Sequence, residues 1–272
     1  MLVALASVKG SPGTTTFALA LAARWPRPGA APALVELDPA GGDVGSRWQR
    51  HDEPGLAGLV LAARHDLVGD GAAFVQRLPV GADVILAPPG DAAAATMAEF
   101  AAVGPAVLRA LAATRPVLAD LGRLDTRSPA LPYLEAADEL VLVVRPRPEE
   151  LRHLRTRLPG LLHRCGRARL VLAGAGPYRP DEIVEYLQLP VAGVAPHDPV
   201  AADILAGRSH PVNRGGLAGR LRRGEGWWTR RPLLAAARTL AGQYATHRAA
   251  GRDTDAFPRR GPDSTRPVEV AP

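Results

Sequence analysis

The sequence predicts an α/β fold, a doubly wound and mostly parallel sheet with helices on both faces. Short apolar runs alternate along the 272 residues with alanine- and leucine-rich stretches, as in a sheet covered by helices on both faces. Several runs, such as "ELVLVV" at 139–144, are apolar at almost every position, which is typical of central strands. The first run also leads directly into a glycine-containing loop and a helical pattern.

We expect strands where these short runs occur in chain order. They are "LVALAS" at 2–7, "ALVELD" at 33–38, "DVILA" at 83–87, "PVLAD" at 116–120, "ELVLVV" at 139–144, "RLVLA" at 169–173 and "VAGVA" at 191–195. The longer stretches between them are rich in alanine and leucine and favour helices. We expect these helices at 14–24, 55–64, 92–113, 148–163, 180–187, 199–206 and 232–247.

Composition and length indicate one domain at 1–247, including a loop at 207–231, and a disordered tail at 248–272. Hydrophobic residues make up 47% of the chain, enough for a full core, whereas 248–272 has few large apolar residues. No apolar run approaches the roughly 18–20 residues that span a bilayer, and "MLVALASVKG" is a first strand rather than a signal peptide. Cys165 is the only cysteine, which excludes an intrachain disulfide, and a cytoplasmic location fits best.

The loop in "SVKGSPGTTT" has the outline of a phosphate-binding site. A strand, glycines and a helix start together present backbone N–H groups to an anion. Gly10 and Gly13 would let the backbone approach a phosphate, Thr15 stands where a hydroxyl binds Mg²⁺, and Lys9 is the only lysine of the chain. The alternative is a simple turn with threonines capping the helix. The candidate nucleotide-binding residues are Gly10, Ser11, Gly13, Thr14, Thr15 and Thr16.

Acidic residues follow two of the predicted strands. Asp38 closes the second strand, Asp43 follows a Gly-Gly turn, and Asp120 ends the strand at 116–120 and is followed by Leu-Gly. Any one of them alone is more often a strand-end or turn residue. Together with the loop, each at the carboxyl end of a strand, they favour a Mg²⁺–phosphate site, with Asp120 beside the metal.

These motifs resemble the ParA/MinD group of P-loop ATPases, whose deviant loop has the form K-G-G-x-G-K-T-T. The resemblance covers 1–212 and is closest to the CpaE/TadZ branch, which is associated with pilus assembly and polar placement. Like that branch, the chain has "VELD" followed by "GDV" at 35–44, "VILAPPGDAAAA" at 84–95, "AADELVLVVRP" at 136–146 and "LPVAGVAPHDPVAADILAGRSHP" at 189–211.

The resemblance implies a role for individual residues. Lys9 matches the signature lysine, which in this family reaches the partner subunit's nucleotide, and it implies a homodimer. Thr15 matches the Mg²⁺ ligand, Asp38 the first-switch carboxylate, and Asp120 the acid after the apolar run. On this basis Lys9, Asp38 and Asp120 are the catalytic candidates, and Thr15 and Asp120 the candidates for Mg²⁺.

Two departures from the family pattern weaken the implied ATP site. Thr14 replaces the lysine that contacts the β- and γ-phosphates, and Ala173 stands where the family usually has an asparagine that reads adenine. Losing one charge-assisted hydrogen bond weakens binding roughly ten- to a hundredfold. We therefore expect a rearranged site with slow or absent ATP hydrolysis that still binds nucleotide, a pseudo-ATPase.

A basic segment runs from Arg208 to Arg231 and holds seven arginines against one acid, together with Trp227 and Trp228. It could bind another protein, nonspecific DNA or an anionic membrane, or be a solvated loop that covers the core. Three functions follow as alternatives. They are a CpaE/TadZ-like scaffold that recruits a secretion or pilus ATPase, an active chromosome-partitioning ATPase that binds DNA through 207–231, and a nucleotide-free interaction module.

Overall fold

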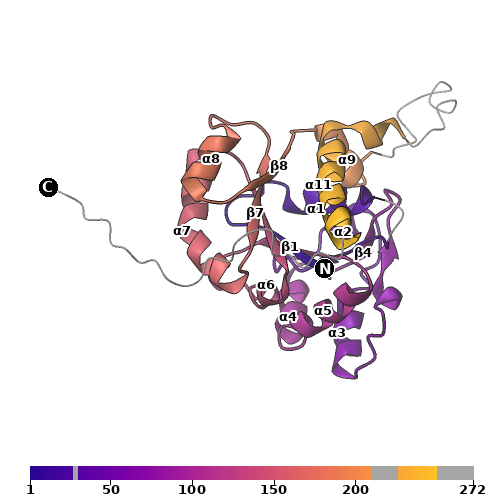
Figure 1. Ribbon diagram of the computed structural model, residues 1–272. Helices are drawn as coiled ribbons and strands as arrows, with labels where there is room; N and C mark the ends of the chain where they lie inside the picture. Colours follow the sequence, from indigo (N-terminus) through magenta and orange to yellow (C-terminus); the bar gives the residue numbers. More distant parts are fainter. Residues whose placement is uncertain (27–29, 210–225, 250–272) are drawn as a thin grey trace, which may run out of the picture.

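The computed structural model describes residues 1–26, 30–209 and 226–249, and within them it contains one eight-stranded sheet (Figure 1). The strand order is β3-β4-β2-β5-β1-β6-β7-β8, and every neighbouring pair is parallel except β3 and β4. The predicted doubly wound, mostly parallel fold is confirmed. The strands are β1 (Leu2–Ser7), β2 (Ala33–Glu36), β3 (Gln76–Arg77), β4 (Asp83–Ile85), β5 (Val117–Arg123), β6 (Glu139–Val144), β7 (Ala168–Ala173) and β8 (Val191–Ala195).

Helices cover both faces of this sheet, and Figure 1 shows α3, α4 and α5 grouped apart from α9 and α11. The α-helices are α1 (Thr14–Ala23), α2 (Val44–Arg47), α3 (Leu56–Arg64), α4 (Asp91–Phe100), α5 (Gly104–Thr114), α6 (Pro132–Ala136), α7 (Pro148–Arg164), α8 (Pro180–Leu187), α9 (Pro199–Leu205) and α11 (Pro232–Ala249). Two 3-10 helices, η1 (Ala72–Phe74) and η2 (Trp227–Arg230), complete the described elements.

The sheet separates two hydrophobic cores because successive side chains of a strand point to opposite faces. In β1, Leu2 and Ala4 pack in the core that also holds residues of α3 to α8, whereas Val3 and Leu5 pack against α1, α9 and α11. All of β1 is buried, which explains its nearly continuous apolar sequence.

The predicted helix at 92–113 was wrong as a single element, because the chain forms α4 and α5 with a bend of 83° between them. Pro105 lies in the first turn of α5, where its missing N–H costs nothing, but inside a continuous helix it would remove a hydrogen bond. Gly104 allows the close approach of Tyr133, since a Cβ at this position would lie 2.6 Å from the Tyr133 ring. Short elements β3, α2 and α6 were not predicted.

Two expectations concern segments that the structure describes only in part. The predicted tail at 248–272 lies outside the described residues from 250 onward, and α11 extends to Ala249. Of the predicted loop at 207–231, positions 210–225 are outside the described residues, and Trp227–Arg230 forms η2. Over the described ranges, no single helix is long and apolar enough to cross a membrane, and α4 with α5 meets the test of length and composition only as a bent pair.

Candidate nucleotide-binding site

The glycine loop connects the carboxyl end of β1 to the first turn of α1. Gly10 has a φ of +64° and Gly13 a φ of +95°, the left-handed region that favours glycine. Gly13 is the N-cap of α1 and leaves that helix without a side-chain cap. As at any helix start, the N–H groups of the first turn have no intrahelical acceptor, so they are free to bind an anion.

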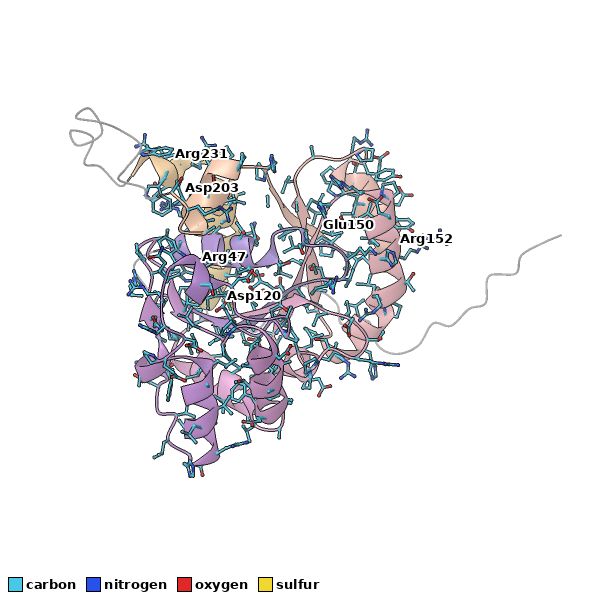
Figure 2. The ribbon with its side chains drawn as sticks, turned by 180° about the vertical axis from the view of Figure 1, so that it is seen from behind. Arg47, Asp120, Glu150, Arg152, Asp203 and Arg231 are labelled. Atoms are coloured by element: carbon cyan, nitrogen blue, oxygen red, sulfur yellow. The ribbon has the colours of Figure 1, made fainter. Side chains whose placement is uncertain are left out.

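Asp120 lies beside this loop because β5 is the neighbour of β1 in the sheet. Asp120 pairs with Leu5 of β1 on one side and with Glu36 of β2 on the other. Its carboxylate is 1% exposed and accepts a hydrogen bond from the Thr15 side chain and one of 3.1 Å from the Gly122 N–H. The structure thus brings together the two residues that the sequence pairs as Mg²⁺ candidates, and Figure 2 shows Asp120 in the interior of the molecule.

Burial raises the pKa of Asp120 to about 6, and the nearby Asp38 adds to this effect. The hydrogen bonds from Thr15 and Gly122, and the charge of Arg47, act in the opposite direction. Burial makes the charged form of this carboxylate unfavourable. A cation beside it would stabilise the charged form, since an opposite charge lowers the pKa.

Glu36 is a second buried acid next to Asp120, and it was not among the predicted site residues. Its Oε1 accepts the N–H groups of Asp43 at 3.1 Å and Val44 at 3.0 Å, and its Oε2 accepts the N–H of Ala87 at 3.1 Å. Burial raises its pKa to about 7, with a further contribution from Asp120. Glu36 therefore holds the segment after β2 against the end of β4. An acid inside the apolar run "ALVELD" is the signal that could have identified it.

Asp38 follows β2 and lies against Gly122 of β5. Gly122 has a φ of +58°, and a Cβ there would lie 1.9 Å from Asp38 Oδ2, so glycine is required by both conformation and space. Asp38 is half-buried and accepts the Ala40 N–H at 2.9 Å, while burial raises its pKa. Asp43 is exposed and pairs with Arg47 at 2.5 Å. Asp38 is close enough to Asp120 to raise the pKa of Asp120.

Two positions of the glycine loop bear on its positive charge, Lys9 and Thr14. Lys9 is exposed and makes no ion pair with any residue that the structure describes. Thr14 is 5% exposed, and its Oγ1 is buried without a hydrogen-bond partner. The position that carries a lysine in the related loops therefore presents no charge here.

A cavity of about 320 Å³ opens beside the loop, between the carboxyl ends of β6, β7 and β8. Its lining includes Ala173, whose methyl group offers no hydrogen bond to a bound base, and Arg145, which the sequence did not single out. Further lining residues are Ser11, Gly13, Thr16, Gly174, His197 and Asp198.

The residues at this site fit Mg²⁺ and a phosphate chain, whereas Thr14 and Ala173 offer neither a charge nor a hydrogen bond to a base. Hydroxyl and carboxylate oxygens, as on Thr15 and Asp120, are the ligands that Mg²⁺ prefers, and the cavity adjoins the loop. The unpartnered Oγ1 of Thr14 marks a polar atom that no described residue satisfies. Across the described part of the chain, no group of three or more His, Cys, Asp or Glu residues could hold a metal by itself, so a Mg²⁺ here depends on water or phosphate ligands.

Asp120 lies inside β5, which continues to Arg123, and not at the end of the strand as predicted. The sheet order, the glycine loop after β1 and this buried acid give a P-loop ATPase fold of the ParA/MinD type. The chain is similar to the septum site-determining protein MinD from Pyrococcus horikoshii in complex with Mg-ADP (TM-score 0.65, 16% identity, 92% of this chain and 98% of that one). It is also similar to a ParA family ATPase from Chlorobium tepidum (0.63, 19%, 88% and 98%).

A third similar structure is a putative plasmid partition protein from Borrelia burgdorferi bound to AMPPNP (TM-score 0.60, 13% identity, 90% of this chain and 98% of that one). At these identities the likeness establishes the fold. No family model matches the sequence, and no curated protein matches it.

Proposed function

We propose that the protein binds ATP with Mg²⁺ at the loop of Gly10 to Thr16 and acts as a ParA/MinD-like spatial regulator or scaffold of the CpaE/TadZ type. The observation that carries this proposal is the pairing of Thr15 with the buried Asp120 next to the loop and its cavity. Such a pairing at the carboxyl ends of adjacent parallel strands is where P-loop proteins hold Mg²⁺.

Each residue has a defined part in this proposal. The loop N–H groups bind phosphate oxygens, Thr15 and Asp120 hold the metal or its water, and Asp38 orients a water near the phosphates. Mg²⁺, when bound, neutralises charge on the phosphate chain. Lys9 is exposed at the surface. In this proposal it reaches the nucleotide of the second subunit in a homodimer.

We propose that hydrolysis is slow or absent because Thr14 carries no charge. Stabilising the charge that develops during phosphoryl transfer is usually the largest part of catalysis. The buried Oγ1 of Thr14 cannot provide it. Ala173 removes the base contact as well, so the affinity for ATP over other nucleotides is also reduced.

Calorimetric titration of ATP and ADP, with and without Mg²⁺, tests the proposal. We expect binding that Mg²⁺ strengthens, and an Asp120→Asn variant that loses the Mg²⁺-dependent increment. Asp125→Asn is the matched control, since Asp125 is exposed just beyond β5 and accepts only a local backbone hydrogen bond from Arg127. No heat at millimolar nucleotide would contradict the proposal and favour a nucleotide-free interaction module.

A measurement of phosphate release from ATP then distinguishes a scaffold from an active partition-type ATPase. We expect turnover at or below the lower end of typical enzyme rates, about one per second, even with DNA present. The described ends of the basic segment do not favour DNA binding, because Arg208 pairs with Asp203 and Arg231 with Asp198. DNA-stimulated turnover would support the partition alternative, and light scattering with and without ATP tests the homodimer.

A further inference from the structure

Arg145 lies directly after β6 and extends toward the glycine loop that follows β1. A Cβ built on Gly10 would lie 2.4 Å from Nη2 of Arg145, so the guanidinium is packed against the loop backbone. The two residues are far apart in sequence and meet because β6 is paired with β1. Gly10 is favoured by its positive φ, and its lack of a Cβ leaves room for this guanidinium.

Glu150 fixes the orientation of this guanidinium. Its Oε1 accepts the Arg145 Nε–H at 2.6 Å, and its Oε2 accepts the Arg145 backbone N–H at 3.1 Å. Glu150 is 3% exposed in the first turn of α7, whereas the Arg145 side chain is 33% exposed (Figure 2 labels Glu150). A buried carboxylate that accepts the Nε–H restricts the orientation of the guanidinium, and the Arg145 residue forms part of the cavity lining.

The terminal nitrogens of Arg145 remain available for a ligand. Neither Nη1 nor Nη2 makes a hydrogen bond with a residue that the structure describes, and the shortest contact of the ion pair with Glu150 is made through Nε. Arg145 also lines the cavity of about 320 Å³, and no other arginine or lysine is among the described residues that line it. A planar guanidinium with two free nitrogens matches the geometry of phosphate oxygens.

We propose that Arg145 binds the phosphate chain of the nucleotide and restores part of the phosphate affinity that the loop loses at Thr14. The positive charge of Arg145 comes from the β6–α7 connection instead of from the first turn of α1, and Glu150 is a positioning residue for it. This inference rests on the proposed nucleotide-binding function. It assigns phosphate recognition to a residue that lies outside the glycine loop.

The test is calorimetric titration of ATP, ADP and adenosine into the wild-type chain and into Arg145→Gln and Arg145→Lys. We expect Arg145→Gln to weaken ATP and ADP binding roughly ten- to a hundredfold, the effect of losing a charge-assisted contact. Adenosine, which has no phosphate, should bind both proteins equally. Arg145→Lys should recover part of the loss, because it keeps the charge but not the planar geometry.

Arg164→Gln is the matched control, because Arg164 makes a similar ion pair of 2.6 Å with Glu135 near the other end of α7. It should leave nucleotide affinity unchanged, and thermal melts check that each variant is folded. Wild-type protein that binds no nucleotide would overturn the proposed function. Wild-type protein that binds ATP no more tightly than Arg145→Gln and Arg145→Lys do would overturn this inference alone. So would an equal loss of ATP and adenosine affinity.

Discussion

Single residues at the carboxyl edge of the sheet show how closely the site is packed. Gly122 is held in the left-handed region against Asp38. Glu36 accepts three backbone N–H groups and forms no ion pair with a residue that the structure describes. Thr14 keeps a buried hydroxyl that has no partner. Unsatisfied polar atoms and constrained backbone are costly, and proteins retain them mostly at functional sites.

Gly122→Ala should destabilise the protein, because the added Cβ would overlap Asp38 and the backbone has a φ of +58°. We expect a loss of about 1–3 kcal/mol in the free energy of unfolding, measured by urea denaturation. Gly160→Ala is the control, since Gly160 lies within α7 with no atom within 4 Å of its Cβ position. That change should stabilise by up to about 1 kcal/mol through helix propensity. Equal effects at both positions would contradict the packing argument.

Glu36 should make stability fall as the pH rises. Burial raises its pKa in the folded protein from 4.5 to about 7, so the folded state keeps a proton that the unfolded chain has already released. The contribution is fully present below about pH 4.5 and is lost as the pH rises through about 7. The shift corresponds to on the order of 3 kcal/mol at 1.36 kcal/mol per unit.

Urea unfolding at several pH values from 5 to 7.5 measures this effect. In Glu36→Gln the decrease in the free energy of unfolding with rising pH that Glu36 causes should be absent. The difference in stability between the variant and the wild type should therefore be smallest at pH 7.5. Gln also places an N–H₂ group where Glu36 accepts hydrogen bonds, so we expect it to be less stable at pH 5. Parallel curves for the two proteins would show that Glu36 ionises normally.

At the scale of elements, α9 and α11 are joined at their first turns. Asp198 caps α9 by accepting the Ala201 N–H at 3.0 Å, and it also accepts hydrogen bonds from Arg231, which precedes α11, the shortest being 2.6 Å. Burial alone would raise the pKa of Asp198, but the Arg231 guanidinium holds it below its usual range. Asp198 also lines the cavity, and its contact with Arg231 joins the residue before α9 to the residue before α11. Figure 2 labels Arg231.

Arg231→Gln should lower the free energy of unfolding at neutral pH, because it leaves the Asp198 side chain, 1% exposed, without its cation. Arg208→Gln is the control: its partner Asp203 is more exposed, so we expect about 0–1 kcal/mol. The stability from Asp198 is present above its unfolded pKa and is lost as the pH falls. The difference between Arg231→Gln and the wild type should therefore shrink toward pH 3, and a constant difference would count against the ion pair.

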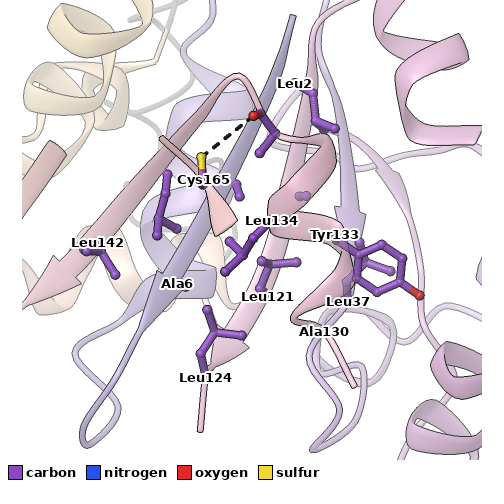
Figure 3. Packing of buried hydrophobic residues seen from close by; sticks show 14 of the residues in the cluster. Leu2, Ala6, Leu37, Leu121, Leu124, Ala130, Tyr133, Leu134, Leu142 and Cys165 are labelled. Atoms are coloured by element: carbon purple, nitrogen blue, oxygen red, sulfur yellow. Dashed lines mark hydrogen bonds between the residues drawn. The ribbon is translucent and has the colours of Figure 1, made fainter. Parts of the chain in front are cut away.

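At the scale of the whole molecule, the parallel sheet directs the functional groups to one edge. The loop, Asp38, Asp120, Arg145 and the cavity all lie at the carboxyl ends of strands, as ligand sites of open α/β sheets do. The apolar side chains along the same strands pack into the two cores, one on each face of the sheet. Figure 3 shows part of one core, where Cys165 lies near Leu134 and Leu142.

Cys165 reports on the integrity of this core. Its thiol is 2% exposed and lies 3.3 Å from the Arg167 carbonyl, and burial raises its pKa. Because the thiolate is the reactive form, labelling by Ellman's reagent should be orders of magnitude slower in the native protein than in denaturant. Its rate should rise with urea in step with unfolding followed by circular dichroism. Rapid labelling without denaturant would show that the α7 end of the core opens locally.

The sequence by itself determined the features that depend on neighbouring residues. The seven predicted strands, the loop at Gly10 and Gly13, and the acids at Asp38 and Asp120 follow from local apolar runs and from the residues that end them. The bend between α4 and α5 was missed, although Gly104-Pro105 carried its signal, because the alanine-rich composition continues on both sides.

Only the tertiary structure decided which of these features meet. Strand order places β5 and β6 on either side of β1, so that Asp120 lies beside Thr15 and Arg145 against Gly10. It also places Glu36 next to Asp120. Side-chain periodicity fixes the face on which a residue points, but it carries no information on which strand will be its neighbour. The order of the strands depends on the packing of both cores at once. The strand order in turn sets the position of every charged side chain at the site.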